Sequence, residues 1–158
     1  MSEVNIQNIH KWCGVLNGYL TAISHLNDNV GFRHGFFAEL IPTNSEDSGA
    51  TIKGYLNDPD FKQRKIGLRE EQKIIEKYVM HNFLFGQEGI DSKNISFIKE
   101  QFTWHIQEYL SFIEIDTPEM GKWEYSKASE KDETTLIFTN YGSWILVMNF
   151  HFRIEKCT

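Results

Sequence analysis

The chain has 158 residues, of which 41% are hydrophobic and 24% are charged, and it carries a formal net charge of −6. A chain of this length can bury a core without a metal ion or a disulfide, so we expect residues 1–158 to form a single domain. Its longest apolar run, Trp144–Met148, is far shorter than the roughly 20 residues needed to cross a membrane. The first residues also lack a secretory signal pattern, and we therefore expect a cytoplasmic protein without membrane contact.

A helix from about Asn5 to Leu26 is predicted by apolar residues that recur in steps of three and four. A second stripe contains only the small residues Gly14, Gly18 and Ala22, although each interior glycine costs a helix about 1 kcal/mol relative to alanine. We expect these small residues to let the helix lie close against a sheet or another helix. The alternative is contact with the backbone of a binding partner. The apolar stripe consists of Ile6, Ile9, Cys13, Leu16, Leu20 and Ile23.

Two short strands are predicted next, at Gly35–Ile41 and Ala50–Leu56, with a polar loop between them. Asp58 and Pro59 then have the residue types of an N-cap and a first helical position, which predicts the start of a helix. Gly67 is expected to interrupt this helix.

Two further helices are predicted in the middle of the chain. Residues 68 to about 84 form the first, because Ile75, Val79 and Phe83 recur every four positions. Asp91–Ile113 carries a helical apolar stripe along its whole length, and we expect a helix there as well. The alternative for its centre is a strand, because Phe102, Trp104 and Ile106 alternate with polar residues.

The C-terminal third is predicted to form antiparallel sheet. Lys122–Tyr125 and Thr134–Thr139 are expected strands, and Asn140–Gly142 matches a hairpin loop with Gly142 in the left-handed conformation. Ser143–Glu155 would be an unusually long strand, which must bend or carry a bulge.

The long strand also indicates how the sheet is covered. Strand alternation places Ile145 and Val147 on one face, followed by polar residues, so this face is expected to be buried only near the hairpin. Because helices and strands come in separate blocks, we expect an α+β fold with helices packed on a mostly antiparallel, curved sheet. The opposite face is entirely apolar and carries Trp144, Leu146, Met148, Phe150, Phe152 and Ile154.

Motifs for common cofactors and metals are absent. The sequence has no phosphate loop, dinucleotide fingerprint, nucleophile elbow or zincin motif, so we expect no cofactor and no metal. Cys13 and Cys157 are expected to be free thiols. His105 and Glu108 are interpreted as a surface pair, with metal ligation as the alternative. His10 could activate Cys13 as a nucleophile, but Cys13 lies on the apolar stripe, which favours a buried structural thiol.

A basic ridge on the predicted third helix raises the question of nucleic acid binding. Arg69, Lys73 and Lys77 recur every four residues and could contact phosphates. The net charge of −6 opposes this function. We therefore interpret the ridge as a solvated helix face and expect no nucleic acid partner.

Asn149, His151 and Arg153 form a candidate pocket. Alternation places them on one face of the long strand, which would be concave if the sheet curves. Histidine can shuttle a proton and arginine can clamp a carboxylate or phosphate, so both suit a small-molecule site. The alternative is the solvated face of a half-exposed sheet.

Acidic residues gather late in the chain. Between residues 108 and 133, eight carboxylates stand against Lys122, Lys127 and Lys131, whereas residues 61–77 are enriched in basic residues. We place Glu130, Asp132 and Glu133 in a loop between strands, Ser126–Glu133, where carboxylates are free to meet a partner. The candidate partner-binding residues are Glu119, Glu124, Glu130, Asp132 and Glu133.

In size, acidity and composition the chain resembles the small acidic immunity proteins that bacteria make against their own toxin domains. The resemblance covers no motif and transfers no residue role. It implies an inhibitor whose carboxylates face a basic toxin surface, such as that of a nuclease domain. The alternative function is a small-molecule-binding protein or enzyme with its pocket in a cone-shaped curved sheet. A high aromatic content, 14% of the chain, suits surface anchors of an interface.

Overall fold

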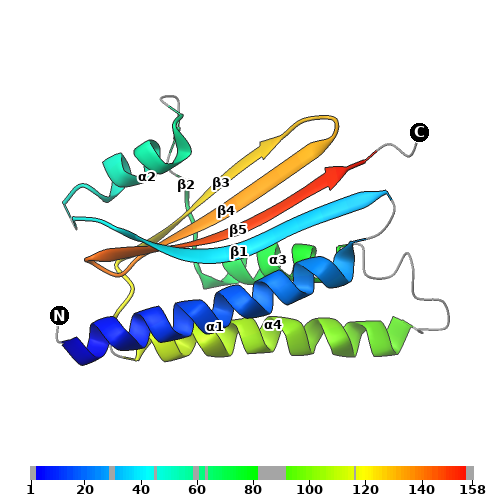
Figure 1. The fold of residues 1–158 in the computed structure, drawn as a ribbon, viewed down its shortest axis with the longest axis horizontal. Coiled ribbons are helices and arrows are strands. Elements are labelled where there is room, and N and C mark those ends of the chain that lie inside the picture. Colours follow the sequence, from blue (N-terminus) through cyan, green and yellow to red (C-terminus); the bar gives the residue numbers. More distant parts are fainter. Residues whose placement is uncertain are drawn as a thin grey trace.

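The computed structural model describes residues 3–28, 31–44, 46–58, 61–62, 64–81, 92–115 and 117–155. The chain folds into a five-stranded antiparallel sheet with helices on both faces, which confirms the α+β prediction (Figure 1). The helices are α1 (Glu3–Asn27), α2 (Ser48–Leu56), α3 (Leu68–Val79) and α4 (Ser92–Glu114). The strands are β1 (Phe32–Pro42), β2 (Arg64–Lys65), β3 (Gly121–Ala128), β4 (Asp132–Asn140) and β5 (Trp144–Ile154).

The long strand β5 is an interior strand of the sheet and lies between β1 and β4. The strand order is β1-β5-β4-β3-β2, and β5 pairs along its length with β1 without a break in register. The sequence predicts that the long strand bends or carries a bulge. The structure shows no bulge in β5, and the sheet accommodates its length by twisting and curving (Figure 1). The hairpin into β5 is also confirmed, because Gly142 has a φ of +92°.

Three helices cover the apolar face of β5. Side chains of α1, α3 and α4 pack on Leu146, Met148 and Phe150, which are fully buried. Trp144 and Phe152 are partly buried against the same core. The prediction that this face forms the core is confirmed, and its burial is the main source of the fold's stability.

The other face of the sheet is covered only near the β4–β5 hairpin, as predicted. There, α2 places Ile52 over Phe138, Ile145 and Val147 in a second, smaller core. Phe61 also packs in this second core. Farther along β5 the same face carries polar residues whose exposure increases toward the strand end: Asn149 is buried, His151 is partly exposed and Arg153 is exposed.

Helix α1 confirms the first predicted helix but not the predicted role of its small residues. Gly14 and Gly18 are exposed, and a Cβ added at either position would meet no neighbouring atom within 4 Å. The expectation that they allow close packing within this fold is therefore wrong, since the helix faces the sheet with Leu16 and Leu20. Close approach of a partner backbone remains untested.

Two predictions between residues 50 and 67 are wrong. Ala50–Leu56 lies within helix α2, where Ile52, Tyr55 and Leu56 share the spacing of a helix face. Asp58 does not begin a helix: the next element is the short strand β2, and α3 starts at Leu68. Pro59, Phe83 and Leu84 lie outside the described residues.

Helix α4 confirms the prediction of a helix over residues 91–113, and the strand alternative is wrong. Ile106, Leu110 and Ile113 are buried at helical spacing. Trp104, which a strand would place beside Ile106, is exposed. The alternation was therefore a coincidence within a helix of 23 residues.

The two edges of the sheet differ. On β1, the outward N–H groups of Ala38 and His34 donate to Asn17 Oδ1 and Asp28 Oδ1. On the other edge, the two-residue strand β2 pairs only with Trp123 and Glu124 of β3.

Candidate partner-binding site

The predicted loop 126–133 is mostly strand. Ser126 belongs to β3, whereas Asp132 and Glu133 begin β4, so only residues 129–131 join the two strands. The loop prediction is wrong here because Asp132 and Glu133, although polar, pair with Arg153 and Phe152 of β5. Two of the three carboxylates are therefore fixed by the sheet, and only Glu130 lies at the hairpin tip.

Three of the predicted partner-binding carboxylates pair within the chain. Asp132 Oδ1 lies 3.0 Å from His151 Nε2. Glu133 lies 2.9 Å from Lys77 Nζ, and Glu124 lies 3.5 Å from an Arg64 guanidinium nitrogen. The basic segment 61–77 thus neutralises two of the eight carboxylates of the acidic stretch that follows it in the sequence. Charged residues that lie close together in the sequence therefore do not form a single charged patch on the surface of this fold.

Glu119 lies apart from the other four predicted carboxylates. It is exposed just before β3, whereas Glu130 follows the far end of that strand. Eight residues of strand span roughly 26 Å at about 3.3 Å per residue. The five predicted residues therefore do not form one patch.

The structure gathers a different set of carboxylates around Glu119. The Thr43 N–H donates to the Ser143 carbonyl, the Met120 N–H donates to the Asn140 carbonyl, and Tyr141 Oη donates to Glu114. These bonds bring the end of β1, the β4–β5 hairpin and the α4–β3 connection to the same end of the molecule (Figure 1). We call this region the acidic end; its carboxylates are Glu46, Asp47, Glu114 and Glu119.

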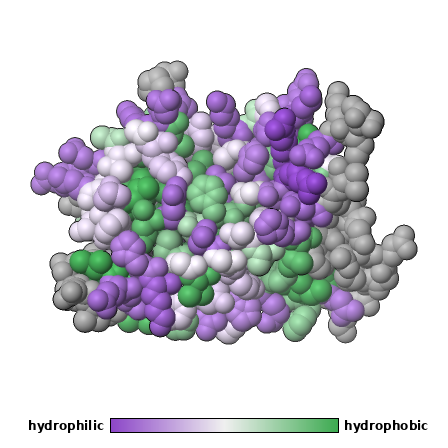
Figure 2. All heavy atoms as spheres, in the orientation of Figure 1, coloured by the Kyte–Doolittle hydropathy of each residue, from purple (hydrophilic) through white to green (hydrophobic). Residues whose placement is uncertain are grey.

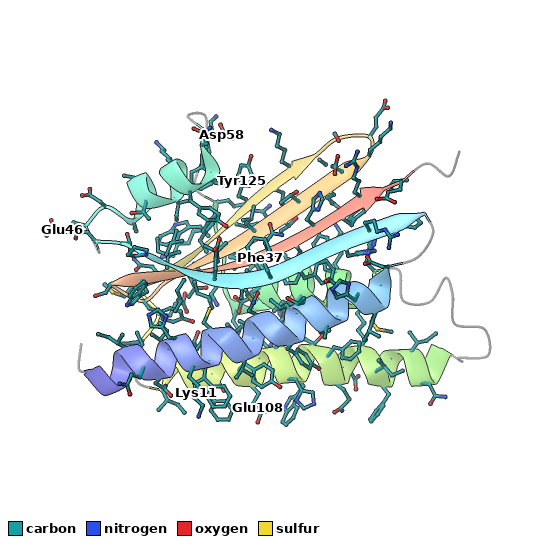
Figure 3. All side chains as sticks on the ribbon, viewed as in Figure 1. Lys11, Phe37, Glu46, Asp58, Glu108 and Tyr125 are labelled. Carbon is teal, nitrogen blue, oxygen red and sulfur yellow. The ribbon has the colours of Figure 1, made fainter. Side chains whose placement is uncertain are left out.

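Large apolar side chains are exposed at the acidic end. Ile115 is 71% exposed and Met120 is 60% exposed, and both flank Glu114 and Glu119 in the sequence. Figure 3 shows Glu46 at the same end of the molecule, on the connection to α2. The region therefore combines carboxylates with exposed apolar groups, and Figure 2 shows hydrophobic and hydrophilic residues next to each other at this end of the molecule. Sequence reasoning did not bring these residues together because they come from three distant segments.

The candidate pocket residues lie on the face of the sheet that α1, α3 and α4 leave open. Asn149 donates its side-chain amide to the Gly35 carbonyl at 2.9 Å, so its amide contributes to holding β5 against β1. His151 pairs with Asp132, and Arg153 is exposed. None of four hollows found among the described residues is lined by Asn149, His151 or Arg153.

A chain of titratable groups that the sequence did not reveal connects β1 with the end of α3. His34 Nδ1 lies 3.2 Å from Asp28 Oδ1, and His34 Nε2 lies 3.0 Å from His81 Nδ1. If neutral His34 donates from Nδ1 to Asp28, its Nε2 accepts a hydrogen bond from His81 Nδ1. Burial lowers the pKa of both histidines below the usual 6.5. The residues are 6 and 47 positions apart, a spacing that no motif records.

Other chemical candidates from the sequence are structural. Cys13 is buried, and burial raises its thiol pKa to about 11, so the nucleophile alternative is not supported. His10 packs edge-on against Trp144. His105 lies 3.6 Å from Glu108 on α4. Among the described residues, no group of three or more histidine, cysteine or acidic side chains is placed to hold a metal ion. Cys157 lies outside the described residues.

No described helix is both long and apolar enough to cross a membrane. The chain matches no protein-family model, and a search of curated proteins finds no match. Function therefore has to be inferred from the placement of the chain's own residues.

Proposed function

We propose that the protein is a binding protein of the immunity type, which neutralises a toxin domain by covering a basic surface with the acidic end. The observation that carries this proposal is the pair of exposed apolar side chains, Ile115 and Met120, at the same end of the molecule as the carboxylates Glu46, Asp47 and Glu119 (Figure 1). Protein interfaces combine an apolar centre with a polar rim, and the acidic end has this composition.

Charge and rigidity both support this surface. The net charge of −6 attracts a basic partner over distance, which raises the association rate. The main-chain bonds of Thr43 and Met120 hold the acidic end against the β4–β5 hairpin, so little ordering is required when a partner binds. A nuclease toxin has a basic surface for its own substrate, and an acidic protein can occupy it.

The test compares two triple variants that each remove three negative charges. The partner is first captured from the native lysate at low salt, and expression of that partner alone should arrest growth unless this protein is co-expressed. Glu46→Gln, Asp47→Asn and Glu119→Gln together should then slow association and flatten its salt dependence. The matched control changes Glu130, Asp132 and Glu133 at the opposite end of β3, and it should leave the association rate nearly unchanged.

Two results would overturn the proposal. A control triple that slows association while the acidic-end triple does not would move the interface to the β3–β4 hairpin. A captured partner that is harmless when expressed alone would remove the toxin-neutralising function. Met120→Ser should speed dissociation, because it removes apolar contact without changing charge.

A further inference from the structure

The edge of β3 is open beyond the two residues that pair with β2. The Ile66 N–H donates to the Lys122 carbonyl, so every second residue of β3, counted from Lys122, turns its main-chain groups away from β4. These groups are unbonded at Ser126 and Ala128, as far as the described residues show. An open edge of this kind can accept an additional strand.

Two hollows meet at this open edge. The edge hollow, of about 360 Å³, continues the line of β2 and is lined by Lys62, Arg64, Tyr125 and Ser126. Tyr125 faces one side of the sheet and Ser126 the other, so this hollow runs along the edge itself. It also borders Glu124.

The helix-side hollow, of about 240 Å³, lies between α3 and the sheet. It shares Glu124 and Ser126 with the edge hollow and is also lined by Lys73, Lys77 and Glu133. A strand placed in the edge hollow would point every second side chain toward the helix-side hollow, because strand side chains alternate between faces. The edge hollow could therefore hold the main chain of an added strand, and the helix-side hollow could hold its side chains.

A chain of hydrogen bonds fixes the wall between the two hollows. Tyr78 Oη lies 2.8 Å from Thr135 Oγ1, which lies 3.1 Å from Ser126 Oγ. Ser126 Oγ in turn lies 3.1 Å from Glu124 Oε1. Because these side chains already bind one another, the wall is organised before any ligand arrives.

The basic side chains that line the two hollows outnumber the acidic ones by one, since Lys62, Arg64, Lys73 and Lys77 stand against Asp58, Glu124 and Glu133. Glu124 is paired with Arg64, and Glu133 is paired with Lys77. Lys62 in the edge hollow and Lys73 in the helix-side hollow form no ion pair with any described residue. Each hollow thus offers one ammonium group to an incoming carboxylate. In the edge hollow that carboxylate competes with Asp58, which accepts a hydrogen bond from Tyr125 Oη.

We propose that the open edge of β3 binds an extended, acidic segment of a protein, which adds to the sheet as a strand. Its main chain pairs with Ser126 and Ala128, and its acidic side chains reach Lys62 and Lys73. Strand addition of this type takes affinity from main-chain bonds and specificity from side-chain pockets. This site is separate from the acidic end and selects a ligand of the opposite charge.

The test is a selection from random ten-residue peptides displayed on phage, with the full chain as bait. We expect the bound clones to be enriched in Asp and Glu relative to the starting library. They should lose at least tenfold in affinity for Ser126→Pro, which removes an outward N–H without touching the β4 ladder. In fluorescence anisotropy with a selected peptide, Lys62→Gln and Lys73→Gln should each weaken binding about threefold.

Two controls separate the site from general charge and from misfolding. Arg69→Gln removes an equal charge from α3 outside both hollows and should not change the affinity. If Ser126→Pro alters the circular dichroism spectrum, a peptide methylated on the main-chain nitrogens that face β3 replaces it and should not bind. The same peptide methylated on the alternate nitrogens should bind normally.

Three outcomes would overturn the proposal: no enriched peptide, enrichment in Lys and Arg, or equal binding to Ser126→Pro with an intact fold. A concentration-dependent dimer that Ser126→Pro abolishes would assign the edge to a second copy of the chain instead.

Discussion

Lys122 places its ammonium nitrogen 2.8 Å from Glu71 Oε1, and the two side chains are only 3% and 1% exposed. Lys122 lies on β3 and Glu71 on α3, so this ion pair joins the sheet to the helix layer. Glu71 Oε2 accepts no hydrogen bond from any described residue. Burial raises the pKa of Glu71, and the nearby Lys122 opposes that rise. Each of these two buried charges is therefore stabilised by the presence of the other.

Removing one partner should be more damaging than removing both. Lys122→Met leaves an uncompensated buried carboxylate, which should lower the free energy of unfolding by about 3 to 5 kcal/mol. The double variant Glu71→Leu, Lys122→Met should recover most of that loss, because it leaves no buried charge. Urea unfolding followed by circular dichroism measures both values. A double variant less stable than Lys122→Met would show that the pair itself stabilises the fold.

The buried histidines predict a loss of stability in mild acid. Burial lowers the pKa values of His34 and His81 below 6.5, so the unfolded chain binds protons more readily than the folded one. Their contribution should be complete above about pH 6.5 and should be lost as the pH falls through the lowered values. Urea midpoints between pH 7.5 and 5.5 should show this slope, and His34→Asn should reduce it. An equal slope in this variant would contradict the assignment.

Alanine at Gly14 and at Gly18 should stabilise the protein. Both glycines lie in an exposed helix face with open space around them, so each substitution should gain about 1 kcal/mol. Gly121→Ala is the contrasting case, because Gly121 has a φ of +156° and an added Cβ would lie 2.7 Å from the Trp123 ring. Melting temperatures should rise for the first two variants and fall for the third. A fall at Gly14 or Gly18 would reveal a packing role that the fold does not show.

The buried face of β5 predicts large cavity effects. Leu146→Ala and Phe150→Ala should each cost about 2 to 5 kcal/mol, because both side chains are fully buried beneath the helices. Ile154→Ala, on the same face but 39% exposed at the strand end, should cost clearly less. Chemical denaturation of the three variants gives the comparison. Equal losses of stability in the three variants would contradict the described decrease in burial toward the end of the strand.

Long periodic segments of this chain could be predicted, and short ones could not. The 11 residues of β5 and the 23 of α4 repeat their apolar pattern often enough to favour one period over the other. The nine residues of α2 do not, since Ile52, Tyr55 and Leu56 make up the whole pattern. The Asp58–Pro59 signal was also misleading, because local capping residues act only where the following residues can bury a helix face.

The candidate sites depend on contacts between distant segments, which explains why sequence reasoning found few of them. The pairing of Lys77 with Glu133 crosses 56 residues and cancels charges that look unopposed along the chain. His34 and His81 lie 47 residues apart, and the residues around either histidine do not indicate that the two side chains meet. Strand register decides that Ser126 faces an open edge, and the register follows from the folded sheet rather than from local residues.

The outer edge of β1 has few free main-chain N–H groups, and this limits the assemblies that the protein can form by strand addition. Asn17 and Asp28 occupy the outward N–H groups of Ala38 and His34, and Pro42 has no N–H to offer. A fibre built by strand addition needs two receptive edges on every molecule, so that each new copy presents a fresh one. Among the described residues of β1, only the outward N–H groups of Phe36 and Leu40 are left without a partner, and they are not consecutive outward positions. An added strand should therefore pair poorly along this edge, and strand addition should end after a single step. The chain can leave β3 open to a ligand without becoming a seed for polymerisation.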